Sequence, residues 1–390
     1  MIYLDNNATT EPLPEVRSAV TCAMSLGPAN PMSAHIAGEP ARRLIAEARD
    51  NVALLIGASP EEILFASSGT EANNLVLHHI SQGPKRKLLT TPVEHESILR
   101  KAEMLTAQGV ACSELPVDHN GVVCLNTAAD LITADVGMVS VQWVNHETGV
   151  IQPVQQLAAL CNRRGVLFHT DAAQAVGKTD VDVERLQADY ITFTGHKFRA
   201  PMGIGVLYRR QGVPLAPLIG GGMQESGFRA GTHNLAGIAG IGVAADIRRH
   251  SLNEIQEKSA RLRDAFEMAV LAKCPRACIN TDASADRICN TTSVRFPGVD
   301  GEALLAQLIT AGICCSQGSA CTSQLPEPSH TLMAMGLTRE EAYQSIRFSF
   351  SEINTKNELE QAAEIISARY ASMKSMLEKH YYPVNPGSIS

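Results

Sequence analysis

Short apolar runs alternate with longer amphipathic segments through the first two thirds of the chain. The runs are rich in β-branched and aromatic residues and predict strands at EILFASS (62–68), RKLLTTPV (86–93), VGMVSVQWV (136–144), GVLFHTD (165–171), YITFTG (190–195) and GIGVLYRR (203–210). Strands that alternate with helical segments are typical of a mostly parallel sheet wrapped by helices. We therefore expect an α/β fold.

The segments between these runs have the periodicity of helices. In EPARRLIAEARDNVALLIGA (39–58), one apolar stripe recurs at helical spacing and contains Leu44, Ala48, Val52 and Leu55. PVQQLAALCNRRG (153–165) has a similar pattern and ends at Gly165, a residue type common just past a helix C-terminus.

The last third of the chain has a different pattern. Residues 235–272 predict a long helix in two pieces that leads away from the sheet. A strand (290–298), a helix (301–312), another strand (345–351) and a late helix follow, the last with a stripe of Leu359, Ala362, Ile366, Tyr370 and Met373. We predict a large domain over residues 14–250 and a smaller α/β domain formed by residues 1–13 and 251–390.

Composition and charge exclude several classes of protein. Of the 390 residues, 45% are hydrophobic, which supports a core, and a net charge of −7 leaves no basic patch for a nucleic acid. No apolar run reaches the roughly 18 residues of a membrane span, and the start, MIYLDNNATTEP, lacks the features of an export signal. The sequence predicts a cytoplasmic protein with no direct nucleic-acid or membrane partner.

The cysteines are too few for a disulfide scaffold. There are 10 of them, and their spacings match no paired CxxC zinc pattern, so we expect free thiols and no metal site. Cys321, in SQGSACTSQL (316–325), is unusual because small and hydroxylated residues surround it. Nothing in this stretch would bury the thiol.

Polar residues follow several predicted strands, where open α/β sheets bind their ligands. After the first strand, Gly69 and Thr70 begin a helix and offer N–H groups, a hydroxyl and the positive end of the helix dipole to a phosphate. The same Ser-Gly-Thr-Glu stretch is also an ordinary capping box. The residues by themselves leave both interpretations open.

Two further strand ends have charged residues. Asp171 ends an apolar strand, where a carboxylate needs a cationic partner such as a protonated pyridine nitrogen, although it is equally suited to capping a helix. Lys197 follows the next strand, where desolvation would free its amine for a Schiff base with an aldehyde. Pyridoxal phosphate (PLP) is bound by three such groups in this order: a phosphate-binding site, a carboxylate that pairs with the pyridine nitrogen, and a lysine that forms the Schiff base.

Ten short motifs in this order closely resemble the cysteine desulfurases of the NifS/IscS type, from residue 3 to about residue 352. They are YLDNNATT, SSGTEANN, EHESIL, VNHETG, HTDAAQ, FTGHK, RAGTHN, GSACTS, LPEPSH and SIRFS. The resemblance implies a PLP-dependent transferase of fold type I, with a large domain built on a mostly parallel sheet of about seven strands and a smaller α/β domain. It also implies that L-cysteine is converted to L-alanine.

The resemblance assigns roles at the cofactor. Lys197 would hold PLP through a Schiff base, Asp171 would face the pyridine nitrogen, and His95 would stack on the ring and move protons. Gln174 would bind the phenolic oxygen. The phosphate would be held by Gly69, Thr70, Thr194 and His196.

Further roles follow for the substrate and for a second subunit. Arg347 would bind the substrate carboxylate, since its planar donors match a carboxylate, whereas an ion-pair or surface role is the alternative. Other substrate contacts would come from Asn7, Asn145 and His146. Arg229 and Thr232 lie in the segment that reaches the partner's site in this family, and Thr232 would complete the phosphate cradle there. The resemblance thus implies a homodimer.

The resemblance also explains Cys321. A thiol on a mobile loop (about 316–328) would enter the site, take the substrate sulfur as a persulfide and carry it to an acceptor protein. Iron–sulfur cluster assembly and the thiolation of tRNA or cofactors are the pathways open to it. Cys314 and Cys315 are expected to be core thiols rather than resolving ones.

This chain departs from its relatives at one site position. Most of them read VNNETG or VNNEIG, whereas this chain has His146 as the third residue of that motif, and an imidazole can titrate near neutral pH. Alternative functions are a selenocysteine lyase, a class V aminotransferase and a catalytically silent sulfur carrier. A transaminase has no use for Cys321, and a silent subunit does not need Lys197, Asp171 and Cys321 together.

Overall fold

The computed structural model describes residues 1–318 and 327–381. Its largest element is a seven-stranded sheet with the order β2-β8-β7-β6-β5-β3-β4. The strands are β2 (Ile63–Ala66), β3 (Lys87–Thr90), β4 (Ala111–Glu114), β5 (Met138–Ser140), β6 (Leu167–Asp171), β7 (Tyr190–Thr194) and β8 (Gly205–Arg209). Only β8 runs antiparallel to its neighbours in this sheet, so the predicted mostly parallel α/β sheet is confirmed.

Within this sheet, β4 is the strand that the sequence did not predict. It forms the edge of the sheet beside β3, and Ala111, Ser113 and Glu114 are exposed. Its sequence, ACSE, has neither an apolar run nor a regular alternation, because an exposed edge strand buries little of its surface.

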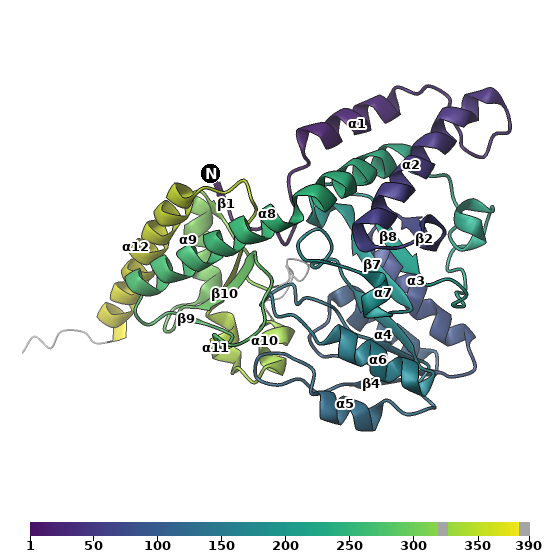
Figure 1. The fold of residues 1–390 in the computed structure, drawn as a ribbon. Helices are drawn as coiled ribbons and strands as arrows, with labels where there is room; N and C mark the ends of the chain where they lie inside the picture. The colour runs from purple at the N-terminus through teal and green to yellow at the C-terminus, as the bar shows by residue number, and fades with distance from the viewer. Residues whose placement is uncertain (319–326, 382–390) are drawn as a thin grey trace, which may run out of the picture.

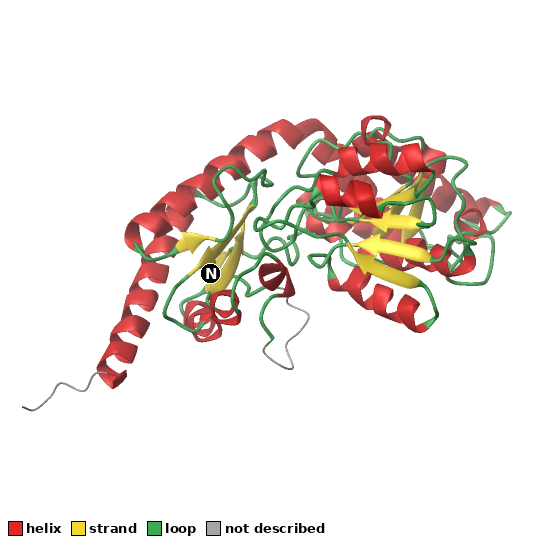
Figure 2. Ribbon diagram, turned by 90° about the horizontal axis from the view of Figure 1, so that it is seen from below, coloured by secondary structure: helices red, strands yellow, loops and turns green. Residues whose placement is uncertain are grey.

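Helices cover both faces of this sheet (Figures 1 and 2). One face packs on α2 (Glu39–Ile56), α6 (Val154–Arg164), α7 (Val183–Leu186) and the first part of α8 (Leu235–Lys273). The other face packs on α3 (Gly69–Gln82) and α4 (Glu96–Ala107). Two short helices lie further out, α1 (Pro14–Met24) against α8 and α5 (Leu125–Leu131) against α6. Gly57 and Gly165 end α2 and α6 in the left-handed conformation, as predicted for Gly165.

The prediction that residues 235–272 form two helices is wrong, because α8 is one continuous helix of 39 residues. The glycines near its start allow close packing. A Cβ on Gly240 would meet Pro201 at 2.5 Å, and one on Gly242 would meet Ala48 at 2.6 Å. Figure 1 shows α8 running from the large sheet to the second layer of the molecule. The predicted boundary between the two domains, after residue 250, falls inside this helix. The division into two domains stays a prediction.

The last third forms a smaller α/β layer of its own. β9 (Cys278–Ile279), β10 (Thr291–Arg295) and β12 (Ser345–Ser349) form an antiparallel sheet in the order β12-β10-β9. α9 (Gly301–Thr310), α12 (Lys356–Tyr381) and the second part of α8 enclose a core that includes Phe266, Phe348 and Ile366. Two short helices follow one another nearby, α10 (His330–Ala334) and α11 (Arg339–Tyr343).

The N-terminal segment joins this smaller layer. β1 (Ile2–Tyr3) pairs in parallel with β11 (Ile313–Cys314), and Asp5 forms a bridge with Ser349 of β12. Residues 6–8 thereby lie between the two sheets.

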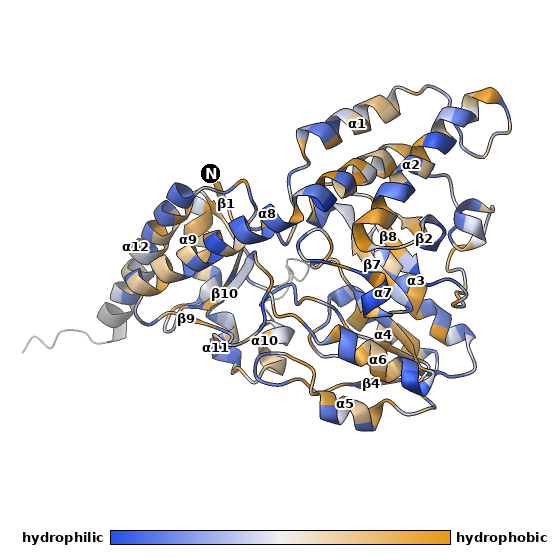
Figure 3. Ribbon diagram, in the orientation of Figure 1, coloured by the Kyte–Doolittle hydropathy of each residue, from blue (hydrophilic) through white to orange (hydrophobic). Residues whose placement is uncertain are grey.

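The helices show the amphipathicity that the sequence predicted. In Figure 3, blue and orange segments alternate along α1, α2 and α12, and Leu359, Ala362, Ile366 and Tyr370 of α12 are buried. Within the described ranges, no helix has a stretch long and apolar enough to cross a bilayer.

Candidate active site

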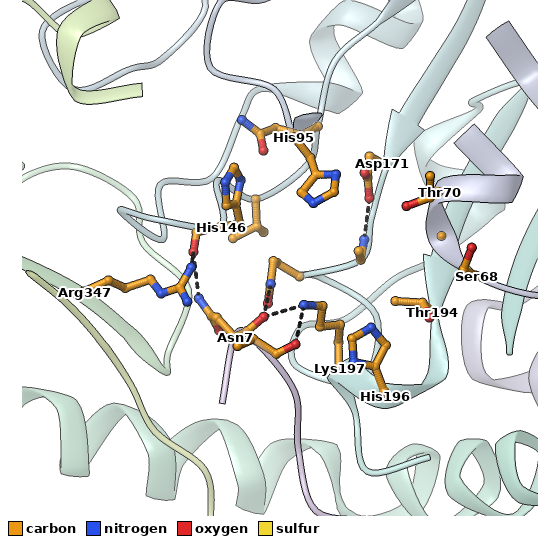
Figure 4. Close-up of a pocket in the computed structure, with 16 residues that line it drawn as sticks. Asn7, Ser68, Thr70, His95, His146, Asp171, Thr194, His196, Lys197 and Arg347 are labelled. Atoms are coloured by element: carbon orange, nitrogen blue, oxygen red, sulfur yellow. Dashed lines mark hydrogen bonds between the residues drawn. The ribbon is translucent and has the colours of Figure 1, made fainter. Parts of the chain in front are cut away.

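A cavity of about 300 Å³ opens at the carboxyl ends of the central strands of the large sheet. β6 ends in Asp171, β7 ends in Thr194, and the 3₁₀ turn Gly195–Lys197 follows directly. Figure 4 shows side chains from these elements and from the N-terminal segment converging on one space. The predicted site residues that line it are Asn7, Gly69, Thr70, His95, His146, Asp171, Gln174, Thr194, His196, Lys197 and Arg347.

One end of the cavity is the start of α3. Ser68 is the N-cap, and its hydroxyl accepts the N–H of Glu71 at 3.1 Å. The cap at Ser68 is therefore confirmed, but the Glu71 carboxylate accepts the N–H of Ser67 at 2.8 Å rather than that of Ser68, so the reciprocal bond of a capping box is displaced by one residue. Because Ser68, Gly69 and Thr70 also line the cavity, the positive end of the helix faces this space and suits a phosphate.

Gly205 allows β8 to pass beside this helix start. A Cβ on Gly205 would lie 2.3 Å from the carbonyl carbon of Ser68 and 2.9 Å from the nitrogen of Gly69. Any other residue at this position would displace the backbone that faces the cavity.

Asp171 is a buried carboxylate held by neutral donors. Its Oδ2 accepts the amide N–H of Asn73 at 2.7 Å, and its Oδ1 accepts the backbone N–H of Ala173 at 2.9 Å. These donors fix the orientation of the carboxylate, and no Lys, Arg or His of the described ranges forms an ion pair with it. A protonated ring nitrogen in the cavity would supply a cationic partner.

Lys197 reaches across the cavity floor to the N-terminal segment (Figure 4). Its Nζ donates to the backbone oxygens of Asn7 at 2.5 Å and Ala8 at 2.9 Å. Its neighbour His196 contacts the hydroxyl of Thr9 at 3.2 Å, and burial together with the nearby Lys197 lowers the pKa of His196 to about 4. His196 is therefore neutral at physiological pH.

His95 and His146 lie on the same wall of the cavity. Their rings meet edge-on, with the centroids 5.5 Å apart. Nδ1 of His95 accepts the backbone N–H of Ser97 at 3.1 Å, which places the proton of the neutral ring on Nε2. Burial lowers the pKa of His95, while the charge of Asp171 acts in the opposite direction.

His146 does not titrate near neutral pH, contrary to what its residue type suggested. Burial, followed by the charges of His95 and Arg347, lowers its pKa well below the usual value. Neither of its ring nitrogens has a hydrogen-bond partner among the described residues. The ring thus brings an unused donor and an unused acceptor to the cavity wall.

Arg347, on β12, closes the side of the cavity towards the smaller layer. It forms an ion pair with Asp5, with Nη2 2.7 Å from Oδ1, and its Nη1 donates to the backbone oxygen of His146 at 3.0 Å. Its Nε is buried and has no partner among the described residues. The ion-pair alternative is therefore correct in part, and a donor remains for a carboxylate ligand.

Three predicted residues do not line the cavity. The Asn145 side chain accepts the N–H groups of Glu147 (2.9 Å) and Thr148 (2.8 Å) and braces the turn that presents His146. Thr232 is exposed, and Arg229 pairs with Glu71 at 2.7 Å. Cys321 and most of the predicted cysteine loop lie outside the described residues.

The sequence did not single out five residues that line the cavity, namely Ala8, Ser68, Gln142, Val144 and Ala173. Gln142 and Val144 were placed inside the predicted strand 136–144, whereas β5 already ends at Ser140, so the rule of strand ends did not reach them. It also missed Lys178, a buried lysine that binds Gln174 and Asn7. Cys315 is buried and Cys314 partly so, as expected for core thiols.

Comparisons with known proteins agree with this geometry. Residues 2–362 match the family model described as aminotransferase class-V. A cysteine desulfurase of Trichormus azollae is 40% identical over 368 residues, which cover 94% of this chain and 92% of that protein. A solved structure described as a NifS-like protein has a TM-score of 0.89 at 35% identity and covers 95% of this chain and 99% of its own.

Another solved structure, described as SspA in complex with cysteine, has a TM-score of 0.81 at 30% identity and covers 91% of this chain and 100% of its own. The chain therefore belongs to the class V aminotransferase family and, within it, to the NifS-type cysteine desulfurases. The resemblance found in the sequence is confirmed.

Proposed function

We propose that this protein is a PLP-dependent cysteine desulfurase that converts L-cysteine to L-alanine and transfers the sulfur to Cys321 as a persulfide. The observation that supports it most is the cavity itself, in which the carboxylate of Asp171, the amine of Lys197 and the unused Nε of Arg347 face one space. The bound cofactor would withdraw electrons from the substrate and weaken the bonds around its Cα.

The residues of this chain divide the work. Lys197 would hold the cofactor and move the Cα proton, Asp171 would neutralise the ring nitrogen, and the start of α3 would bind the phosphate with Thr194 and His196. His95, with a proton on Nε2, is placed to hold or move a proton at the cavity wall. Arg347 and His146 bind the substrate.

The sulfur transfer balances without an external oxidant. The C–S bond of cysteine breaks, a bond forms between its sulfur and the sulfur of Cys321, and the thiol protons end on the carbon of alanine and on the persulfide. Backbone hydrogen bonds join Ser316 to Arg347 (2.7 and 3.2 Å), so the chain that leads to Cys321 starts beside the proposed carboxylate site. The residues from 316 to 321 span at most about 17 Å, a reach that fits transfer from this cavity.

We also propose a homodimer in the cytoplasm. Large apolar side chains are exposed on and near α1 and on the loops around β8, including Met24, Ile36, Met202 and Met223. Thr232 and Arg229 lie on one of these loops. A dimer formed there would cover the apolar residues and bring Thr232 to the partner's phosphate seat. Analytical ultracentrifugation tests it, with Met223→Asp expected to favour the monomer.

The test of the function uses purified protein loaded with PLP. With L-cysteine and a reductant, we expect equimolar alanine and sulfide, and Cys321→Ser should abolish both while the protein stays yellow. Cys22→Ser, which removes an exposed thiol from α1, is the matched control and should keep its activity. Pyruvate-dependent transamination without sulfide would indicate an aminotransferase, and a colourless, inactive protein would indicate a silent carrier.

Two finer points have their own tests. A parallel assay with L-selenocysteine measures the preference between sulfur and selenium. Transfer of ³⁵S from the Cys321 persulfide to candidate acceptor proteins tests the proposed role in iron–sulfur cluster assembly or in thiolation.

A further inference from the structure

Lys178 is a buried lysine beside the candidate active site that has no role in the proposed mechanism. It is 6% exposed, and its Nζ donates to Oε1 of Gln174 at 2.5 Å and to Oδ1 of Asn7 at 3.2 Å. Both partners are neutral amides that line the cavity. Burial, followed by the positive charge of Lys197, lowers the pKa of Lys178 to about 7. A buried amine whose hydrogen-bond partners, in the part of the chain that the structure describes, are amide oxygens is uncommon and needs an explanation.

The chemistry of lysine decides how these two amides are oriented. The amine has at least two N–H groups whether it is protonated or neutral, and it donates in both contacts, so both amides turn their oxygens towards Lys178. The Nε2 group of Gln174 then faces away from Lys178, and one of its N–H bonds goes to the backbone oxygen of Asn7 at 3.1 Å. Its second N–H remains for an oxygen atom in the cavity.

The same contact orients Asn7. Its Oδ1 accepts from Lys178 and also from Nδ2 of Asn290 at 3.2 Å, so its Nδ2 donates to the backbone oxygen of His146 at 3.1 Å and to the hydroxyl of Thr291 at 2.9 Å. The backbone oxygen of Asn7 is also the acceptor for Lys197. Lys178 thus helps to orient the Asn7 side chain, while its contact with Gln174 fixes an amide that lines the cavity.

We propose that Lys178 is a positioning residue for the cofactor: it fixes the Gln174 amide with an N–H towards the cavity, where that group donates to the phenolic oxygen of PLP. This role rests on the proposed function, since it requires that the cavity binds PLP. Lys178 acts through Gln174 and touches neither cofactor nor substrate. Without it, the Gln174 amide can rotate and present its oxygen, which would repel an anionic ligand.

A double-mutant cycle on PLP affinity tests this role. PLP-free protein is titrated with PLP, and the dissociation constant is measured from the absorbance of the bound cofactor. We expect Lys178→Met to weaken binding about tenfold, and Gln174→Met to weaken it to a similar extent. The double variant should be no weaker than Gln174→Met alone, because Lys178 acts through that amide. Lys101→Met removes another buried lysine of the large sheet layer, on α4, and should change affinity less than twofold.

The outcomes separate this proposal from its alternatives. A purely structural lysine would lower the melting temperature but leave the affinity for PLP within twofold, and losses that multiply in the double variant would mean that Lys178 acts independently of Gln174. Either result overturns the role. If Lys178→Met does not fold, Lys178→Gln replaces it in the same cycle. Wild-type protein that fails to bind PLP would refute the proposed function itself, whereas normal binding with multiplying losses refutes only the role of Lys178.

Discussion

The Nε2 atom of His146 lies 3.6 Å from Oε1 of Glu147, and neither atom has a hydrogen-bond partner among the described residues. Both side chains are buried, and the other carboxylate oxygen of Glu147 accepts from the hydroxyl of Ser329 at 2.5 Å. A small movement would join the imidazole to the carboxylate and leave the second nitrogen for a ligand. His146, which lines the cavity, thus has a ring nitrogen with which to bind a polar group there.

His146→Ala should therefore weaken the binding of L-cysteine, raising KM about tenfold through the loss of one hydrogen bond in a buried site. His146→Asn should recover most of this loss, because an amide also has a donor and an acceptor. Steady-state kinetics at pH 7.5 measure both effects.

The pH dependence gives an independent check on His146. Its pKa is held well below 6.5 by burial and by the charges of His95, Arg347, His330 and Lys197, so the ring stays neutral between pH 6.5 and 8.5. The profile of kcat/KM over this range should have the same shape in wild type, His146→Ala and His146→Asn. A limb that disappears in both variants would show that His146 titrates there after all.

Arg347→Lys should raise KM for L-cysteine by roughly 30-fold while changing PLP affinity less than twofold. A lysine keeps the positive charge beside Asp5, but it cannot reproduce the planar set of donors that matches a carboxylate. Arg295→Lys is a matched control, because Arg295 lies on the neighbouring strand β10 and pairs with Glu341. Equal effects of the two substitutions on KM would show that Arg347 does not bind the substrate carboxylate.

Asp171→Asn should reduce the rate of alanine formation by about 100-fold or more, since an amide cannot compensate the charge of a protonated ring nitrogen. It should also shift the absorbance maximum of the bound cofactor. Asp189→Asn offers a comparison, because Asp189 is equally buried beside the same sheet but pairs with Arg210. We expect the comparison variant to be less stable and to keep its spectrum; an unchanged spectrum in Asp171→Asn would contradict the assignment.

Glu94 gives a prediction about stability. Burial raises the pKa of this carboxyl to about 8, against the hydrogen bonds from Thr91 and Gln142. Between pH 4.5 and 8 the folded protein therefore keeps a proton that the unfolded chain releases, so this residue makes the protein less stable as the pH rises. Glu94→Gln should remove that loss and be more stable than wild type by about 1–3 kcal/mol at pH 8, with a smaller difference at pH 5.

Urea unfolding at the two pH values measures this change. The exposed Glu61→Gln serves as the control and should follow wild type. Parallel curves for wild type and Glu94→Gln would mean that Glu94 is ionised in the folded protein.

Much of the fold followed from the sequence because its central strands are buried on both faces. Apolar runs such as those of β6 and β7 have no other stable environment in a chain of this kind. The continuity of α8 could not be predicted from the sequence. A glycine can interrupt a helix or allow a neighbouring segment to pack closely against it, and the sequence does not show which of the two applies. Only the positions of Pro201 and Ala48 distinguish the two.

The candidate site also contains residues that could be predicted from the sequence and residues that could not. Asp171, Thr194 and Lys197 were found because each directly follows an apolar strand, and the topology brings such residues to one edge. Asn145 and His146 are adjacent, and which of them faces the cavity depends on the turn that Asn145 makes with its own backbone. Nothing in the sequence singled out Lys178, because the residue type alone does not show whether a lysine is buried or exposed.

The pairing of β1 with β11 has a consequence for how the protein matures during its synthesis. Ile2 leaves the ribosome early, but its partner Ile313 is made more than three hundred residues later. Asn7 also has partners in this late part of the chain, since its backbone N–H donates to the hydroxyl of Ser349 at 2.8 Å and its side chain donates to that of Thr291 at 2.9 Å. All strands of the central sheet have therefore been made before the partners that fix Asn7, a residue of the cavity wall, leave the ribosome.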